Sequence, residues 1–227
     1  MSSRALVILS GGQDSATCLY WALKKFDEIE TITFDYGQRH RIELECAAEL
    51  SKRLNLKNTL IPIDSLKALG SNSLVDSSQK ISETGGFQNL PSTFVPGRNA
   101  LFLTLAAAYA APRFISHLVI GACETDFSGY PDCRDVFMTS MEESLKLAMD
   151  FEFKIHRPLM KLNKAETFKM ADDLGALSTV IELTHTCYEG VRRDLHSWGY
   201  GCGECPACKL RKRGYEEFFK MKETSHG

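Results

Sequence analysis

Hydrophobic positions along the first third of the chain follow two alternating patterns. The apolar run 4–9 ends in a glycine pair and is typical of a buried strand, whereas 14–26 carries apolar residues at helical spacing. The β-branched segment 30–35 predicts a second strand, the amphipathic segment 41–54 a second helix, and 59–63 a third strand. This β-α-β-α-β order predicts an α/β fold, a doubly wound parallel sheet with helices on both faces.

The alternation is interrupted and then resumes. Residues 64–96 are rich in Ser, Asn, Gly and Gln, and so long a loop in a compact domain is usually functional or mobile. The pattern beyond it predicts a buried helix over 98–111, a strand over 117–122, a helix that ends near Asp150 and a strand near 154–156.

The last part of the chain has a different character. A helix is expected over 163–174, with Asn163 as its N-cap and Glu166 completing a capping box. Beyond it the sequence is rich in cysteines, glycines and basic residues before a terminal helix. We therefore expect a principal unit over 1–180 and a C-terminal segment over 181–227 that packs on it.

Composition excludes several classes of protein. The chain has 227 residues, a formal net charge of −2 and 44% hydrophobic residues, which excludes disordered and collagen-like proteins. Near-neutral charge argues against a dedicated nucleic-acid binder. The apolar stretch 100–111 is shorter than the roughly 20 residues that span a bilayer, and the run 5–9 is too short for a signal peptide. We expect a soluble, cytoplasmic protein that neither enters membranes nor binds nucleic acid directly.

Six consecutive residues, Ser10-Gly11-Gly12-Gln13-Asp14-Ser15, join the first strand to the first helix. Glycines let a backbone approach a ligand closely, and the N-terminus of a helix attracts anions. Ser10 and Ser15 add hydroxyl groups, and Asp14 either caps the helix or helps to hold a Mg²⁺ that bridges phosphates. The segment lacks the Walker A pattern, yet its strand-loop-helix context predicts a phosphate-binding loop.

Eight cysteines in a cytoplasmic chain are expected to be reduced, buried or bound to metal. Four of them predict a closed tetrahedral Zn²⁺ site, with an iron–sulfur cluster as the alternative. These are Cys187, Cys202, Cys205 and Cys208. The neighbouring His185 and His196 are not expected to be ligands. Cys18 and Cys46 fall on apolar helix faces and are interpreted as core thiols, whereas Cys123 and Cys133 lie in a polar loop.

The motifs together resemble a known family. SGGQDS is similar to the loop of the PP-loop ATP pyrophosphatase superfamily. The segments FDYGQRH at 34–40, FVPGRN at 94–99 and ETDFSGYPDCRD at 124–135 follow in order, before the cysteine cluster. In this combination the chain resembles the 7-cyano-7-deazaguanine synthase family of queuosine biosynthesis. The similarity covers nearly the whole chain and is weakest over 64–90 and after Gly214.

The resemblance implies a fold, an activity and its cofactors. The fold is a Rossmann-like PP-loop domain with a C-terminal zinc-bearing helical segment, and a homodimer is expected. The enzyme would be a carbon–nitrogen ligase that converts 7-carboxy-7-deazaguanine and ammonia into the nitrile, through adenylated carboxylate and amide intermediates. ATP, Mg²⁺ and a structural Zn²⁺ are the implied cofactors. Two other hypotheses are a tRNA-modifying enzyme that grips RNA with the basic run 209–213, and a nucleotide-binding regulator without chemistry.

Residue roles follow from the motifs and the resemblance. Nucleotide binding is assigned to Leu9, Ser10, Gly11, Gly12, Gln13, Asp14, Ser15, Phe34 and Tyr36. Substrate binding is assigned to Glu124, Asp126, Phe127, Ser128, Tyr130, Asp132 and Arg134. Catalysis is assigned to Asp14, Ser15, Arg98 and Lys164.

Within these sets some roles stay open. A carboxylate can accept both donors of the deazaguanine edge, for which Asp126 with Asp132 is our choice. Arg134 or Arg98 can pair with the substrate carboxylate. Lys164 and Lys161 are as consistent with solvated helix-start residues as with phosphate binding, and the role of Cys133 stays open.

Overall fold

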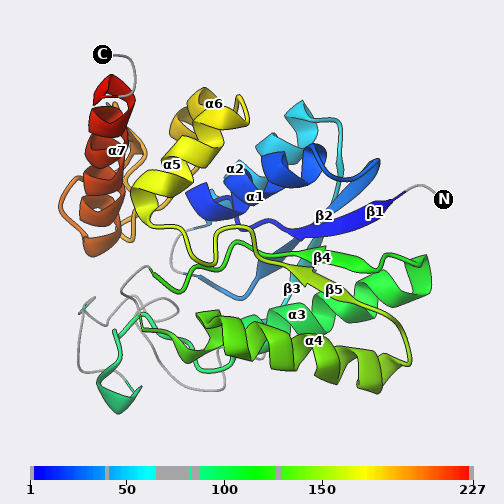
Figure 1. Cartoon of the computed structure of the whole chain (residues 1–227). Helices are drawn as coiled ribbons and strands as arrows, with labels where there is room; N and C mark the ends of the chain where they lie inside the picture. Colours follow the sequence, from blue (N-terminus) through cyan, green and yellow to red (C-terminus); the bar gives the residue numbers. More distant parts are fainter. Residues whose placement is uncertain (1–2, 39–40, 65–81, 83–86, 126–128, 225–227) are drawn as a thin grey trace.

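A computed structural model describes residues 3–38, 41–64, 82, 87–125 and 129–224 (Figure 1). In this part of the chain five parallel strands form one sheet, in the order β3-β2-β1-β4-β5. The strands are β1 (Arg4–Ile8), β2 (Glu28–Asp35), β3 (Lys57–Pro62), β4 (His117–Val119) and β5 (Lys154–His156). Because the chain moves outward from β1 to β3 and then returns to β4 on the other side of β1, the strand order reverses beside β1. In such sheets ligands bind at the carboxyl ends of the strands near that reversal.

Helices cover both faces of the sheet (Figure 1). One face is covered by α1 (Gln13–Leu23), α2 (Ile42–Arg53), α5 (Lys164–Asp173) and α6 (Leu177–Leu183), and the other by α3 (Arg98–Ala110) and α4 (Asp135–Met149). The side chains of β1 alternate between the two cores: Leu6 and Ile8 pack with the α3–α4 layer, and Val7 packs with the opposite layer. The doubly wound α/β fold predicted from the sequence is confirmed.

The C-terminal segment packs against this body. The two short strands β6 (Leu195–His196) and β7 (Gly199–Tyr200) form an antiparallel pair before α7 (Pro206–Thr224). Phe218 of α7 joins the apolar core that contains Phe168 of α5. The two helices meet at Gly214, where an added Cβ would lie 2.6 Å from Cβ of Lys164. The absence of a side chain at Gly214 therefore allows α7 to lie directly on the start of α5.

Local signals predicted most elements within a few residues. The capping box of α5 is present: Glu166 N–H donates to Asn163 Oδ1 at 2.9 Å, and Asn163 N–H donates to Glu166 Oε2 at 2.7 Å. The strand expected over 117–122 ends earlier, at Val119. Neither α6 nor the β6–β7 pair was predicted. Most of the loop expected over 64–96 lies outside the described residues, and no described helix has the length and apolarity needed to cross a membrane.

Three one-turn 3₁₀ segments complete the described structure. They are η2 (Phe87–Asn89), η3 (Ala111–Arg113) and η4 (Pro131–Cys133).

Candidate functional site

The loop between β1 and α1 is held in shape by hydrogen bonds between its serine hydroxyl groups and its own backbone. Ser15 Oγ donates to the Gly12 carbonyl at 3.1 Å and accepts from Ser10 N–H at 3.2 Å. Gly12 N–H donates to Ser10 Oγ at 3.3 Å. Gly11 has a φ of +87°, and a Cβ there would lie 2.0 Å from the carbonyl oxygen of Glu43 in α2. The loop is therefore held against α2 in a conformation that only glycine adopts without strain.

A second glycine brings the end of β4 against the same loop. A Cβ on Gly121 would lie 2.8 Å from the backbone nitrogen of Ser15, at the start of α1. The N-terminus of α1 is thus enclosed between the ends of β1 and β4. Backbone N–H groups at a helix N-terminus, together with two serine hydroxyls, form an environment that suits a phosphate group.

Asp14 pairs with Lys164 across the site. Lys164 Nζ lies 2.9 Å from both Oδ1 and Oδ2 of Asp14, and the two side chains are 11% and 28% exposed, respectively. Gly12, not Asp14, is the N-cap of α1, and no side chain caps that helix. The interpretation of Asp14 as a helix cap is therefore wrong, whereas its proximity to Mg²⁺ stays a prediction.

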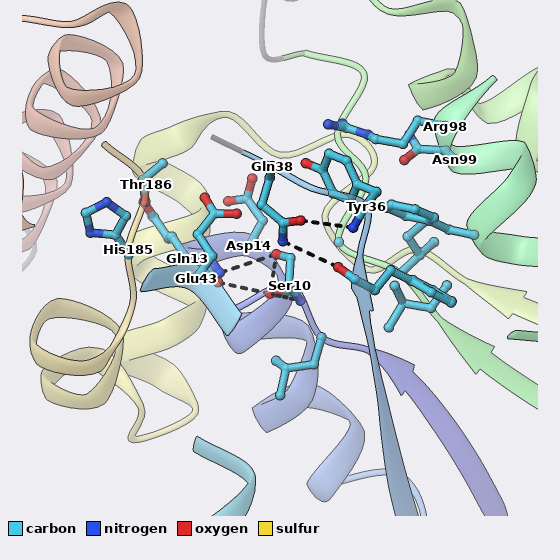
Figure 2. Close-up of a pocket in the computed structure, with 18 of the residues that line it drawn as sticks. Ser10, Gln13, Asp14, Tyr36, Gln38, Glu43, Arg98, Asn99, His185 and Thr186 are labelled. Atoms are coloured by element: carbon cyan, nitrogen blue, oxygen red, sulfur yellow. Dashed lines mark hydrogen bonds between the residues drawn. The ribbon is translucent and has the colours of Figure 1, made fainter. Parts of the chain in front are cut away.

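A cavity of about 300 Å³ opens above the loop (Figure 2). Its apolar wall includes Phe34, Tyr36 and Phe102, and the rings of Phe34 and Phe102 stack with centroids 4.5 Å apart. Of the residues predicted to bind nucleotide, all but Gly11 line this cavity: Leu9, Ser10, Gly12, Gln13, Asp14, Ser15, Phe34 and Tyr36. Gly11 shapes the loop from behind. A flat apolar slot that ends in a phosphate loop has the chemistry to hold a nucleotide.

A second cavity of about 240 Å³ shares a wall with the first. Gln13, Asp14, Arg98 and Tyr130 line both cavities, and Lys164 lines the second one. Burial opposes the charge of Arg98, but the nearby Tyr36 and Asp132 outweigh it, so the pKa of Arg98 stays above its ordinary value. Arg98 thus lies in the shared wall and Lys164 in the wall of the second cavity, which suits the negative charge of a phosphate and of a carboxylate.

The polar loop after β4 is only partly described, because Asp126, Phe127 and Ser128 lie outside the described residues. Tyr130 lines both cavities, and its hydroxyl is hydrogen-bonded to Thr93.

The other predicted substrate residues of this loop have partners in the fold. Asp132 Oδ2 accepts from Asn99 N–H at 3.0 Å, in the first turn of α3, and Glu124 Oε2 accepts from Asp135 N–H at 3.4 Å, at the start of α4. Both carboxylates therefore interact with helix N-termini, where negative charge is favourable. Arg134 and Lys161 are both exposed, and neither of them lines a cavity. Their roles toward a substrate stay predictions.

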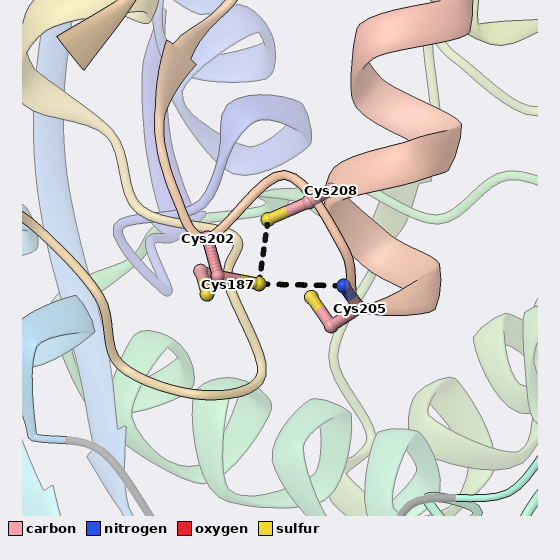
Figure 3. Close-up of side chains that lie close together, drawn as sticks. All are labelled: Cys187, Cys202, Cys205 and Cys208. Atoms are coloured by element: carbon pink, nitrogen blue, oxygen red, sulfur yellow. Dashed lines mark hydrogen bonds between the residues drawn. The ribbon is translucent and has the colours of Figure 1, made fainter. Parts of the chain in front are cut away.

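The four predicted metal-ligating cysteines converge beside the first cavity (Figure 3). Their sulfur atoms all lie within 4.8 Å of one another, and the Cys202 and Cys208 sulfurs are 3.9 Å apart. Sulfur atoms about 2.3 Å from one tetrahedral zinc ion lie roughly 3.8 Å from each other. Hydrogen bonds from the Cys205 and Cys208 thiols lower the pKa of Cys187, which favours a thiolate. The cluster fits a four-thiolate metal site.

The two nearby histidines have other partners. His185 is fully buried and its Nε2 lies 3.1 Å from the Cys187 carbonyl. His196 Nε2 lies 3.1 Å from the Gly201 carbonyl, and its ring stacks on Trp198. Neither contributes a nitrogen to the cysteine cluster among the described groups that could hold a metal.

The segment that leads into the cysteine cluster is joined to the phosphate loop. His185 N–H donates to the Gly11 carbonyl at 3.0 Å. The adjoining Thr186 accepts from Arg211 Nη1 at 2.8 Å, and Arg211 also donates to the Trp198 and Val180 carbonyls. Arg211 is 1% exposed, and burial lowers its pKa to about 10. One buried guanidinium therefore connects α6, the cysteine segment and α7 beside the second cavity.

The basic run 209–213 is engaged within the chain. Besides the buried Arg211, Lys209 lies 3.6 Å from Glu204, and Arg213 lies 3.8 Å from Glu217. Lys209 and Arg213 remain largely exposed in these pairs, so a role of this run toward RNA stays a hypothesis.

Several cavity residues were not expected from the sequence. They are Gln38, Glu43, Asn99, Phe102, Ile120, Gly121, His185, Thr186 and Tyr188. The motif FDYGQRH pointed to the neighbourhood of Gln38. No local sequence signal indicates that Glu43 lines the cavity, because it belongs to an ordinary amphipathic helix. The same holds for His185, whose position depends on how the C-terminal segment packs against the sheet.

The fold and the loop define an α/β protein of the PP-loop type. The chain matches the model of the family described as queuosine biosynthesis protein QueC over residues 4–219. It belongs to this family, whose proteins act in queuosine biosynthesis.

Solved structures with a similar fold are more distant. A 4-thiouridine synthetase, solved in complex with RNA and bound ATP, has 16% identity and a TM-score of 0.52, over 98% of this chain and 53% of that one. The U34-tRNA thiolase NcsA from Methanococcus maripaludis has 13% identity and a TM-score of 0.49, over 98% and 66%. The NH3-dependent NAD synthetase from Campylobacter jejuni has 20% identity and a TM-score of 0.47, over 79% and 67%. At these identities the likeness concerns the fold alone.

Proposed function

We propose that this chain is a carbon–nitrogen ligase that converts 7-carboxy-7-deazaguanine, ammonia and ATP into 7-cyano-7-deazaguanine. The observation that carries the proposal is the pair of adjoining cavities at the phosphate loop, in a chain of the queuosine biosynthesis family. The first cavity takes ATP, with the adenine against Phe34 and Tyr36 and the phosphates on the loop. The second takes the flat acid, with its carboxylate directed to the shared wall.

The chemistry begins with activation of a poor acyl donor. The substrate carboxylate attacks the α-phosphorus of ATP, pyrophosphate leaves, and Arg98 and Lys164 offset the negative charge that gathers there. Ammonia then displaces AMP to give the amide. A second ATP activates the amide oxygen in the same way, with release of pyrophosphate, and loss of AMP and of both N–H protons leaves the nitrile. Mg²⁺ would accompany ATP, and Asp14, which lines both cavities, is the residue that would hold it and so help to neutralise the phosphates.

In this proposal the C-terminal segment 181–227 stabilises the unit 1–180 by packing on it. Its four cysteines hold a structural Zn²⁺, which keeps their thiolates in place and takes no part in the reaction. The resemblance also favours a cytoplasmic homodimer. A role directly on RNA is the alternative, for which the exposed Lys209 and Arg213 of the basic run are available, whereas Arg211 is buried.

The test is a reaction of the purified full chain with carboxy-deazaguanine, Mg²⁺-ATP and ammonium, followed by mass spectrometry of the base and by assay of AMP and pyrophosphate. We expect the amide and then the nitrile, with AMP release that depends on the acid. A parallel reaction contains unmodified tRNA in place of the free acid. AMP release with tRNA alone would favour the RNA-modifying alternative, and ATP binding without any AMP release would contradict the proposal.

A further inference from the structure

Gln13 has a buried side chain without a partner at the place where the two cavities meet. It is the first residue of α1 and is 2% exposed, and among the described residues neither Oε1 nor Nε2 has a hydrogen-bond partner. It lines both cavities. An unsatisfied buried polar group costs about 1–3 kcal/mol. An amide in this position offers one acceptor and two donors to a small polar ligand.

Glu43 of α2 also lines the first cavity, to which Gln13 contributes from α1 (Figure 2). Among the described residues, its carboxylate makes no hydrogen bond and no ion pair. Its backbone is fixed, because the Glu43 carbonyl lies against the Cα of Gly11. Burial, only partly offset by Arg98, raises the pKa of Glu43 to about 7.

The other acidic group on this wall is already engaged. Asp14 forms two short contacts with Lys164, whose Nζ lies 2.9 Å from both of its carboxylate oxygens. Glu43 is the carboxylate of the described cavity wall that remains available to a neutral, proton-donating ligand. Ammonia is such a ligand: it is small, donates hydrogen bonds and must lose protons during the proposed reaction.

We propose that Gln13 and Glu43 form the ammonia site of this enzyme. The Gln13 Oε1 accepts an N–H of the incoming ammonia, and the Glu43 carboxylate receives the proton that the nitrogen releases. This assignment rests on the proposed function and adds to it the residues that bind and deprotonate the nucleophile.

The step balances without a further reactant. The nitrogen lone pair forms the C–N bond to the acyl carbon of the adenylate, and the bond from that carbon to the phosphate oxygen breaks. AMP leaves with the electron pair of that bond. One N–H proton passes to Glu43, which later releases it to water. A base whose pKa lies near the working pH is best suited to accept and release a proton in each turnover.

The charges around Glu43 are compatible with this role. Arg98 favours its anion, whereas burial disfavours it, and Cys46 lies on the same helix. The phenols of Tyr36 and Tyr188 have pKa values raised chiefly by their own burial and remain neutral near pH 7. The Asp14–Lys164 pair on the same wall contributes one charge of each sign.

The test separates activation of the acid from attack by ammonia. The Glu43→Gln variant is compared with wild type and with Glu45→Gln, a matched change at an exposed position of α2. ATP–pyrophosphate exchange with the acid, in the absence of ammonium, reports activation. Ammonium-dependent AMP release reports the attack, measured across pH with free ammonia held constant.

We expect Glu43→Gln to keep exchange within about twofold of wild type and to lose AMP release by roughly 100-fold, the scale of one general base. The wild-type rate should rise through about pH 7, and this acid limb should be absent in the variant. The second variant, Gln13→Leu, should raise KM for ammonium about tenfold, the effect of one lost hydrogen bond of about 1.4 kcal/mol, and this increase should exceed any change in KM for ATP or for the acid.

Two results would overturn the ammonia site. One is an equal loss of exchange and AMP release in Glu43→Gln, which would place Glu43 in nucleotide binding. The other is unchanged AMP release with an unchanged pH profile. Failure of the proposed function gives a different result, because wild type itself would then show no exchange with the deazaguanine acid.

Discussion

The phosphate loop and the cysteine cluster are neighbours in space, but they are held in different ways. The loop consists of consecutive residues between a strand and a helix, and its own hydrogen bonds and Gly11 define its shape. The cysteine cluster collects side chains from separate parts of a segment with little regular structure. Its apolar support is small, with Trp198 as the largest member. The sheet therefore preorganises the first site, whereas in our proposal a metal ion organises the second.

The difference also concerns stability. At the phosphate loop the fold keeps polar groups buried without partners, as at Gln13, and this lowers stability in exchange for ligand binding. At the cysteine cluster we propose that a metal ion is part of the folded state, so that its binding adds to stability. The two regions are linked by the His185–Gly11 hydrogen bond and by the contact of Gly214 with Lys164.

Loss of the metal should have the largest effect. We expect Cys205→Ser to lose bound metal and to lower the free energy of unfolding by several kcal/mol, because structural zinc contributes directly to folding. This corresponds to a fall in Tm of more than about 10 °C for a chain of this size. Metal analysis and differential scanning calorimetry are the measurements, and limited proteolysis should cut first between Cys187 and Cys208.

A suitable control is Cys46→Ala, at a buried thiol in α2 that lies outside the cluster. It should keep the metal and lose only about 1 kcal/mol of stability. Loss of metal with an unchanged Tm in Cys205→Ser would show that the cluster is stable without the ion, and the contrast between the two regions would fail.

Lys164 contacts both regions, because it pairs with Asp14 and packs against Gly214 of α7. Its replacement tests whether the side chain acts in the reaction or only in packing. We expect Lys164→Met to lower kcat/KM by roughly 100- to 1,000-fold, because a cation that stabilises transferred phosphate is lost. Metal content should stay at the wild-type level. Steady-state kinetics with ATP and metal analysis measure both effects.

The matched control for this variant is Lys169→Met, which removes a lysine that pairs with Asp173 on the exposed side of α5. It should leave activity unchanged. If Lys164→Met lost metal together with activity, Lys164 would act through the packing of α7 and not through the phosphates.

The sequence predicted the features that have local signals and missed those that depend on packing between distant elements. Residues 10–15 were assigned correctly to the junction between a buried strand and the first helix, because apolar periodicity and glycines are local signals. The four cysteines were recognised by spacing, again a local signal. Glu43 and His185 were not, because each reaches the cavity only through packing between elements distant in the chain. The roles given to Glu124 and Asp132 were inferred from composition, which does not show that both carboxylates face helix N-termini.

The smallest effect we predict is a gain in stability at the phosphate loop. The folded-state pKa of Glu43, about 7, lies above its ordinary value of 4.5, so its contribution to stability is complete below pH 4.5 and is lost as pH rises through 7. Glu43→Gln removes this loss. We therefore expect the free energy of unfolding of the variant to exceed that of wild type by about 1–2 kcal/mol at pH 8, after allowance for solvent in the cavity. Urea unfolding at pH 5 and pH 8 measures the difference, which should be small at pH 5 and absent at both values for Glu45→Gln. A variant less stable than wild type at pH 8 would mean that the Glu43 carboxylate supports the fold, as the cysteines do, and does not oppose it.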